Sequence, residues 1–184
     1  MKTNDQKATF ASPAELRIVR SLPGPIERVW EYLTDDAKRA RWFAGGKMEP
    51  RPGGKIELFF RHENISPGEQ PPEKMKHVQD PGFTMPGTVL RWEPPRVLSY
   101  TFDEGSDVTF ELTPDGQNVT LVLTHRSRGV DLPYVSGYAS GWHSHLTLLI
   151  ALLEGAPRPP FWAHHMELRE HYERVLAAMG GKKA

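Results

Sequence analysis

The sequence of 184 residues predicts an α+β fold, in which an antiparallel sheet of six or seven strands curls around a long C-terminal helix. The first observation behind this prediction is the length, which fits one domain. The second is the alternation of apolar and polar residues between residues 55 and 126, which is typical of strands with one buried face. The third is a long apolar helical segment that follows these strands and can cover the apolar face of the sheet.

The chain begins with residues 1–12, which are polar and contain no apolar segment of the kind found in signal peptides. We expect a mobile arm there. The first strand is predicted over Glu15–Ser21, where apolar and charged residues alternate. A helix is predicted over residues 25–34, because it has a proline near its start and its apolar residues recur at helical spacing. A short capped helical turn is expected to follow through Arg41.

Five strands are predicted in the middle of the chain. They are Lys55–Glu63, Gly87–Glu93, Arg96–Asp103, Asp107–Thr113 and Asn118–Arg126. Their separators, such as Pro94-Pro95 and Pro114-Asp115-Gly116, are turn sequences, so neighbouring strands are expected to pair antiparallel. The segment Asn64–Pro81 contains four prolines and no clear strand, and it is longer than a simple hairpin needs.

Two helices are predicted at the end of the chain, over residues 133–154 and 160–179. We therefore expect a domain over residues 13–156 and a helical extension over residues 157–184. The segment Leu146–Leu153 is apolar on all sides of its helix, so one sheet cannot cover it. Either the extension helix or a second copy of the chain must cover the outer side. We favour the extension helix, with some contact in a homodimer.

Four groups of residues, taken in chain order, carry a resemblance to known proteins. They are Val29-Trp30 with Thr34-Asp35 and Trp42, Gly87-x-Val89 with Pro94-Pro95 and Leu98-x-Tyr100-Thr101-Phe102, Thr120–His125, and Gly141-Trp142 with Leu146 and Leu149. Together they resemble the START-like (SRPBCC, helix-grip) superfamily. Within it, the chain is similar to the AHSA-like family, which is named for the C-terminal domain of the activator of the 90-kilodalton heat-shock-protein ATPase. The resemblance implies an apolar cavity between the sheet and the long helix.

The first half of the long helix carries small residues, Gly137 and Gly141, opposite large aromatic residues of the sheet. They would leave a cavity under the helix, or they would let the helix approach the sheet closely; we favour the cavity. The expected ligand-binding residues are Phe60, Trp92, Tyr100, Phe110, His125, Gly141, Trp142 and His145. The loop Asn64–Pro81 is expected to lie at the mouth of the cavity as a lid, because long loops are often functional.

Several histidines are candidates for a polar role in the predicted cavity. His62, His125 and His145 are expected to point inward, where an imidazole either binds a ligand or a proton, or is a satisfied core residue. His164, Glu167 and His171 share one stripe of the last helix with the spacing of metal ligands, but an exposed amphipathic face is the favoured interpretation. We therefore predict no metal and no cofactor.

The composition excludes several functions. The 23 basic and 23 acidic residues give no net charge, which argues against a nucleic-acid partner. No stretch reaches the apolar length of a membrane span, and the absence of cysteine fits a cytoplasmic protein. The sequence contains no G-x-S-x-G, H-E-x-x-H or P-loop motif, so no catalytic residue is predicted.

The predicted function is therefore non-enzymatic binding of a small hydrophobic molecule. Two alternatives stay open. One is a protein-interaction domain of the chaperone-ATPase-activator type, with a chaperone as partner. The other is a cyclase- or aromatase-type enzyme that uses the same cavity, with Tyr100 or His145 in acid–base work.

Overall fold

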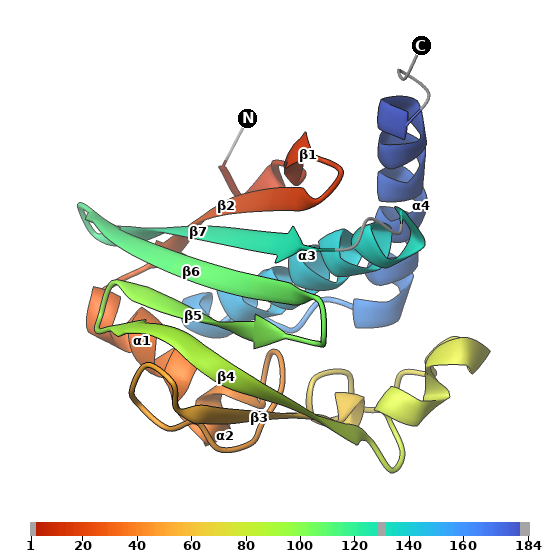
Figure 1. The fold of residues 1–184 in the computed structure, drawn as a ribbon. Helices are drawn as coiled ribbons and strands as arrows, with labels where there is room; N and C mark the ends of the chain where they lie inside the picture. The colour runs from red at the N-terminus through yellow and green to blue at the C-terminus, as the bar shows by residue number, and fades with distance from the viewer. Residues whose placement is uncertain (1–2, 129–131, 181–184) are drawn as a thin grey trace.

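Seven antiparallel strands form one sheet in the computed structural model, which describes residues 3–128 and 132–180 (Figure 1). The order across the sheet is β1-β2-β7-β6-β5-β4-β3. The strands are β1 (Thr9–Ser12), β2 (Glu15–Pro23), β3 (Lys55–Phe60), β4 (Phe83–Glu93), β5 (Val97–Phe102), β6 (Ser106–Asp115) and β7 (Asn118–Ser127). The helices are α1 (Ile26–Thr34), α2 (Asp36–Arg39), α3 (Leu132–Glu154) and α4 (Phe161–Gly180). The predicted α+β class and the sheet around a long helix are confirmed.

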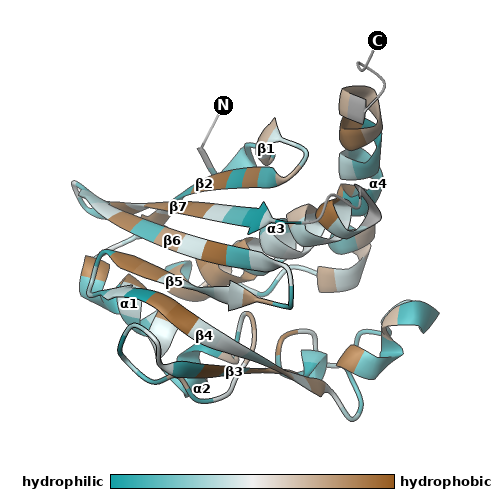
Figure 2. Ribbon diagram, in the orientation of Figure 1, coloured by the Kyte–Doolittle hydropathy of each residue, from teal (hydrophilic) through white to brown (hydrophobic). Residues whose placement is uncertain are grey.

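The core lies between the sheet and α3. Apolar and polar residues alternate along the strands, as Figure 2 shows for β2, β6 and β7. The helix α3 is buried on more than one side, and the residues of the face that packs against the sheet recur every three or four positions. Those residues are Ala139, Trp142, Leu146, Leu149 and Leu153, each at most 3% exposed. Burial of this face against the sheet stabilises α3, since helices gain more from packing than from intrinsic propensity.

The start of the chain differs from the predicted mobile arm. Residues 9–12 form the edge strand β1, which pairs with β2. Phe10 packs edge-on against Tyr172 of α4, with ring centroids 5.9 Å apart, and the backbone N–H of Ala8 donates to the Tyr172 hydroxyl. The polar composition concealed this element, because among residues 4–12 only Ala8 and Phe10 pack into the apolar core. Residues 1–2 lie outside the described residues.

The extension helix α4 folds back onto α3, but it crosses the helix before the apolar run Leu146–Leu153. The contacts between the two helices involve Ser140, His143 and His145 on α3. His143 Nδ1, for example, is 2.8 Å from the Tyr172 hydroxyl of α4. The helix α4 therefore covers the half of α3 that carries small and polar residues.

A buried arginine shapes the chain between α2 and β3. Arg39 is only 1% exposed, and its guanidinium donates to the backbone carbonyl oxygens of Thr34, Ala44 and Gly46. Burial lowers the pKa of Arg39, although Tyr100, Asp36 and Asp35 partly compensate. These three hydrogen bonds fold residues 34–46 into a compact turn, which directs the ring of Phe43 into the interior.

Candidate functional site

A pocket of about 620 Å³ lies between the sheet, α3, α4 and the segment that joins β3 to β4. The helix α3 contributes six residues to its wall, and the other elements contribute mainly aromatic and apolar side chains with a few polar and charged ones. The α3 residues are Tyr134, Gly137, Tyr138, Gly141, Trp142 and His145. The sheet and its loops add Phe43, Phe60, His62, Met75, Val78, Phe83, Met85, Phe102 and Asp103, and α4 adds Phe161, Trp162, His165 and Arg169.

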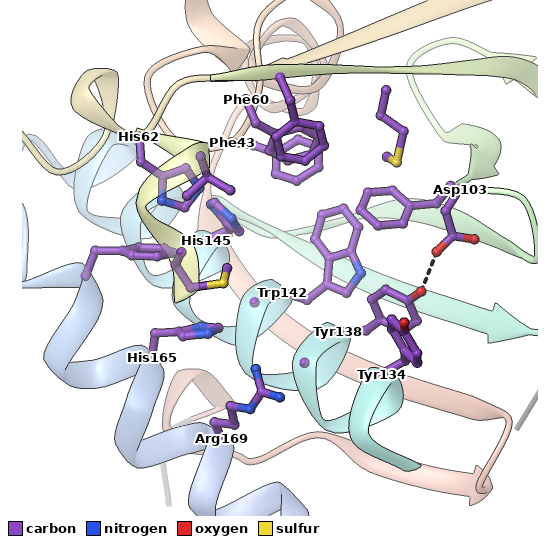
Figure 3. Close-up of a pocket in the computed structure, with 18 of the residues that line it drawn as sticks. Phe43, Phe60, His62, Asp103, Tyr134, Tyr138, Trp142, His145, His165 and Arg169 are labelled. Carbon is purple, nitrogen blue, oxygen red and sulfur yellow. Dashed lines mark hydrogen bonds between the residues drawn. The ribbon is translucent and has the colours of Figure 1, made fainter. Parts of the chain in front are cut away.

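Phe43 stands at the centre of the aromatic wall (Figure 3). Its ring centroid lies 5.2 Å from that of Phe60, 4.8 Å from that of Trp142 and 5.1 Å from that of His145. Aromatic rings at these separations pack favourably and are rigid, with few rotatable bonds. The wall is therefore a preformed apolar surface that suits a flat molecule.

Two glycines of α3 open onto this space. A Cβ atom placed on Gly137 or Gly141 would meet no atom within 4 Å outside the helix's own nearby backbone. Both residues line the pocket, so they do not mark a close approach of α3 to the sheet. Glycine inside a helix costs about 1 kcal/mol relative to alanine. The two glycines therefore leave this space open and make the helix α3 less stable.

Three imidazoles gather at one side of the pocket. The ring centroids of His62 and His145 are 5.6 Å apart, and His62 stacks on Trp162 at 4.9 Å. His145 Nδ1 lies 2.7 Å from the carbonyl oxygen of Trp42. Burial lowers the pKa of His62 and of His165 to about 4, and it lowers the pKa of His145 well below its ordinary value. All three rings are therefore uncharged at neutral pH.

Asp103 and two tyrosines lie on the opposite side (Figure 3). The Asp103 carboxylate accepts hydrogen bonds from the Tyr138 hydroxyl, from the Ser106 hydroxyl and from the backbone N–H of Gly105. Burial and the neighbouring Asp103 raise the pKa of Tyr138. Tyr134 is 65% exposed, so this side is close to solvent. The pocket thus has a buried histidine side and a more accessible carboxylate side.

Four of the eight expected ligand-binding residues line the pocket: Phe60, Gly141, Trp142 and His145.

The other four lie outside it. Trp92 packs edge-on against Trp30, and Tyr100 packs beside Phe110 in the layer behind the pocket. The indole N–H of Trp142 donates to His125 Nδ1 over 3.0 Å, which fixes the orientation of the Trp142 ring.

The wall that α4 contributes was not predicted from the sequence. Phe161, His165 and Arg169 recur every four residues and line the pocket. This spacing places them on one face of a helix, and it is the signal in the sequence that could have identified them. The neighbouring stripe, considered as a metal site, lies elsewhere: the His164 ring contacts His143 at 5.6 Å. No three metal-ligating side chains converge within residues 3–128 and 132–180.

The segment between β3 and β4 is tied to the beginning of α4. The Glu69 carboxylate accepts hydrogen bonds from the backbone N–H groups of Phe161 and Trp162, at distances of 2.9–3.1 Å. Arg158 donates to the carbonyl oxygen of Asn64 over 2.9 Å. These contacts bring Met75 and Val78 into the pocket wall.

A curled antiparallel sheet around a long helix, with a pocket between them, defines the helix-grip class. Residues 23–154 match the family described as "Activator of Hsp90 ATPase homolog 1-like protein", and the chain belongs to this family. The helix α4, which supplies one wall of the pocket, lies beyond the matched residues. None of the curated proteins matches the chain.

Solved structures agree with this assignment. The protein encoded by gene BPP1335 of Bordetella parapertussis is 37% identical, with a TM-score of 0.79 over 95% of this chain and 92% of that chain. CalU16 of Micromonospora echinospora is 24% identical, with a TM-score of 0.62 over 90% and 87% of the two chains. Protein EF2215 of Enterococcus faecalis, of unknown function, is 18% identical, with a TM-score of 0.72 over 96% and 94%. The last two show the fold alone.

The helices that the structure describes include none with the length and apolar character needed to cross a membrane.

Proposed function

We propose that the protein binds a small, mainly apolar molecule in this pocket, without turning it over. The observation that carries the proposal is the open space beside Gly137 and Gly141, in a pocket with rigid aromatic walls. Its volume of about 620 Å³ lies in the range of small-molecule sites, which is about 300–1,000 Å³. A chain selected only for stability would fill such a space, because unfilled apolar volume costs stability.

The loop between β3 and β4 is proposed as the lid. It supplies Met75 and Val78 to the wall, and Glu69 fastens it to α4. Methionine suits such a place, because its flexible side chain adapts to ligands of different shape. A ligand would enter when the loop separates from the first turn of α4.

The test compares two substitutions to leucine. Gly141→Leu places a side chain in the pocket where its Cβ meets no neighbour. Ala163→Leu places the same side chain on the exposed face of α4, next to Trp162 but outside the pocket. Native mass spectrometry of freshly purified protein would reveal a co-purified ligand, and binding of the uncharged dye N-phenyl-1-naphthylamine would report on an empty pocket.

We expect the original chain and Ala163→Leu to carry ligand or bind the dye, and Gly141→Leu to lose this binding at least tenfold. Circular dichroism should show that both variants are folded. Folded protein that neither carries a ligand nor binds the dye would overturn the proposal, as would undiminished binding in Gly141→Leu.

The family's description favours a second candidate, interaction with a chaperone ATPase. Exposed apolar side chains such as Phe83 and Leu90, 39% and 40% exposed, would supply the contact surface. A pull-down with the 90-kilodalton chaperone would test it, with Leu90→Ser as the surface variant. Retention by the chaperone that Leu90→Ser weakens would support it, whereas no retention would contradict it. A cytoplasmic location, which this candidate requires, stays a prediction.

A further inference from the structure

We propose that the molecule bound in the pocket is uncharged and carries a hydroxyl group that donates a hydrogen bond to His145 Nε2. The inference rests on the proposed function and specifies the chemical class of the ligand: a flat, mainly apolar body with a hydroxyl at the histidine side. It follows from the protonation of His145 and from the charges around it.

The hydrogen bond to Trp42 decides the protonation of His145. A carbonyl oxygen can only accept a hydrogen bond, so Nδ1 of His145 carries the proton that faces Trp42. In a neutral imidazole the other nitrogen then holds a lone pair. No hydrogen bond from another described residue reaches His145 Nε2. His145 therefore offers a hydrogen-bond acceptor to the pocket that it lines.

The aromatic neighbours of His145 are polar but uncharged. The Nδ1 atoms of His62 and His165 and the indole Nε1 of Trp162 are buried, and no partner within the described part of the chain hydrogen-bonds them. An unpaired buried polar atom costs about 1–3 kcal/mol. A hydroxyl can both donate and accept, so it fits this group of rings better than a purely apolar ligand does.

A carboxylate does not suit the histidine side. The imidazoles are neutral because burial lowers their pKa values. Arg169 is the one arginine or lysine in the pocket wall within the described residues; it lies beside His165 on α4, and its Nε donates to Glu173 over 3.1 Å. A carboxylate has no proton to donate, so it would be repelled by the Nε2 lone pair of His145 rather than bound by it.

An ammonium group does not suit it either. The only carboxylate that lines the pocket within the described residues is Asp103, and Figure 3 places it on the side away from the imidazoles. Asp103 already accepts three hydrogen bonds, from Tyr138, Ser106 and Gly105. The histidine side therefore suits an uncharged group that donates a hydrogen bond.

The test uses three probes that share one flat body: 2-naphthol, 2-methoxynaphthalene and 2-naphthoate. Isothermal titration calorimetry of the full chain at pH 7.5 measures each dissociation constant. We expect 2-naphthol to bind about tenfold more tightly than 2-methoxynaphthalene, because a single hydrogen bond is worth about this factor. We expect 2-naphthoate to bind more weakly than 2-naphthol.

His145→Asn is the decisive variant. The amide nitrogen of asparagine replaces Nδ1 and can still donate to Trp42, but nothing replaces the Nε2 acceptor. In His145→Asn, the ratio of the dissociation constants of 2-methoxynaphthalene and 2-naphthol should fall to about one. The preference for 2-naphthol should persist in His171→Ala, which removes an imidazole from α4 outside the pocket. This ratio is insensitive to the fraction of folded protein.

The outcomes separate the two proposals. Equal binding of 2-naphthol and 2-methoxynaphthalene, tighter binding of 2-naphthoate, or a preference that survives in His145→Asn would overturn the hydroxyl inference and leave the apolar pocket standing. If none of the three probes binds and no ligand co-purifies, the proposed function fails and the inference falls with it.

Discussion

His145 Nδ1 on α3 donates to the backbone carbonyl oxygen of Trp42, 2.7 Å away and 103 positions earlier in the sequence. This hydrogen bond joins the long helix to the turn that Arg39 holds together. Trp42 is 1% exposed, so its carbonyl lies in a part of the core that water does not reach. The bond therefore stabilises the fold as well as fixing which nitrogen of His145 carries the proton.

Replacing His145 by leucine should destabilise the protein more than replacing it by asparagine. Leucine leaves the Trp42 carbonyl unpaired, which costs about 1–3 kcal/mol, whereas asparagine can still donate to it. Urea unfolding followed by circular dichroism measures both free energies of unfolding. Equal stabilities of the two variants would show that the bond contributes nothing to folding.

Gly137→Ala and Gly141→Ala should each raise the free energy of unfolding by up to about 1 kcal/mol, because alanine is the better helix former and its Cβ meets no neighbour. Thermal unfolding measures the change. Gly46→Ala is the opposite control, because Gly46 has a φ of +99° and its Cβ would lie 2.3 Å from the Glu57 carbonyl oxygen. That variant should be destabilised. A loss of stability in Gly137→Ala and Gly141→Ala would contradict the open space beside them.

The protein should lose stability as the pH falls from about 6.5 toward 4. Burial lowers the pKa of His62, His125 and His165 to about 4, whereas the unfolded chain has ordinary histidine pKa values near 6.5. The unfolded state thus binds protons first, so acid favours unfolding, and stability is complete only above about pH 6.5. Each unit of lowered pKa corresponds to about 1.4 kcal/mol at the acid limit.

Urea unfolding at several pH values checks this dependence. His165→Gln removes one of the titrating groups, so the free energy of unfolding should vary less steeply with pH in this variant. A free energy of unfolding that stays constant between pH 7 and 4.5 would contradict the prediction.

The fold could be predicted because strand alternation and helical spacing are local patterns. Two features of the strands could not be predicted from these local patterns. Strict alternation over the predicted strand Gly87–Glu93 would place Leu90 and Trp92 on one face, but an irregularity in pairing between Val89 and Arg91 shifts the alternation, and Leu90 is 40% exposed. The strand predicted to reach Glu63 ends at Phe60, because residues 62–64 turn into a short 3₁₀ helix that carries His62 to the pocket. Such irregularities depend on tertiary contacts.

The site could be predicted only in part, for a related reason. Trp142 and His145 belong to α3, whose inward face follows from its own periodicity. Phe161 and His165 reach the pocket because α4 turns back across α3, and the short connection between the helices does not specify that crossing angle. Tyr100 and Phe110 do face inward, but they fill the layer behind Trp142 and never reach the open space.

Glu69→Ala should loosen both the first turn of α4 and the loop between β3 and β4. The Glu69 carboxylate satisfies two backbone N–H groups at the helix start, where negative charge is also favourable, and such a cap is worth about 1 kcal/mol. Amide hydrogen exchange at Phe161 and Trp162 should therefore quicken about fivefold. Glu73→Ala removes a carboxylate from the same loop whose ion pair with Lys76 is exposed, and it should leave this exchange unchanged. If the loop acts as the lid, Glu69→Ala should also speed the release of bound 2-naphthol. Unaltered exchange at both amides would show that Glu69 does not fasten the loop to α4.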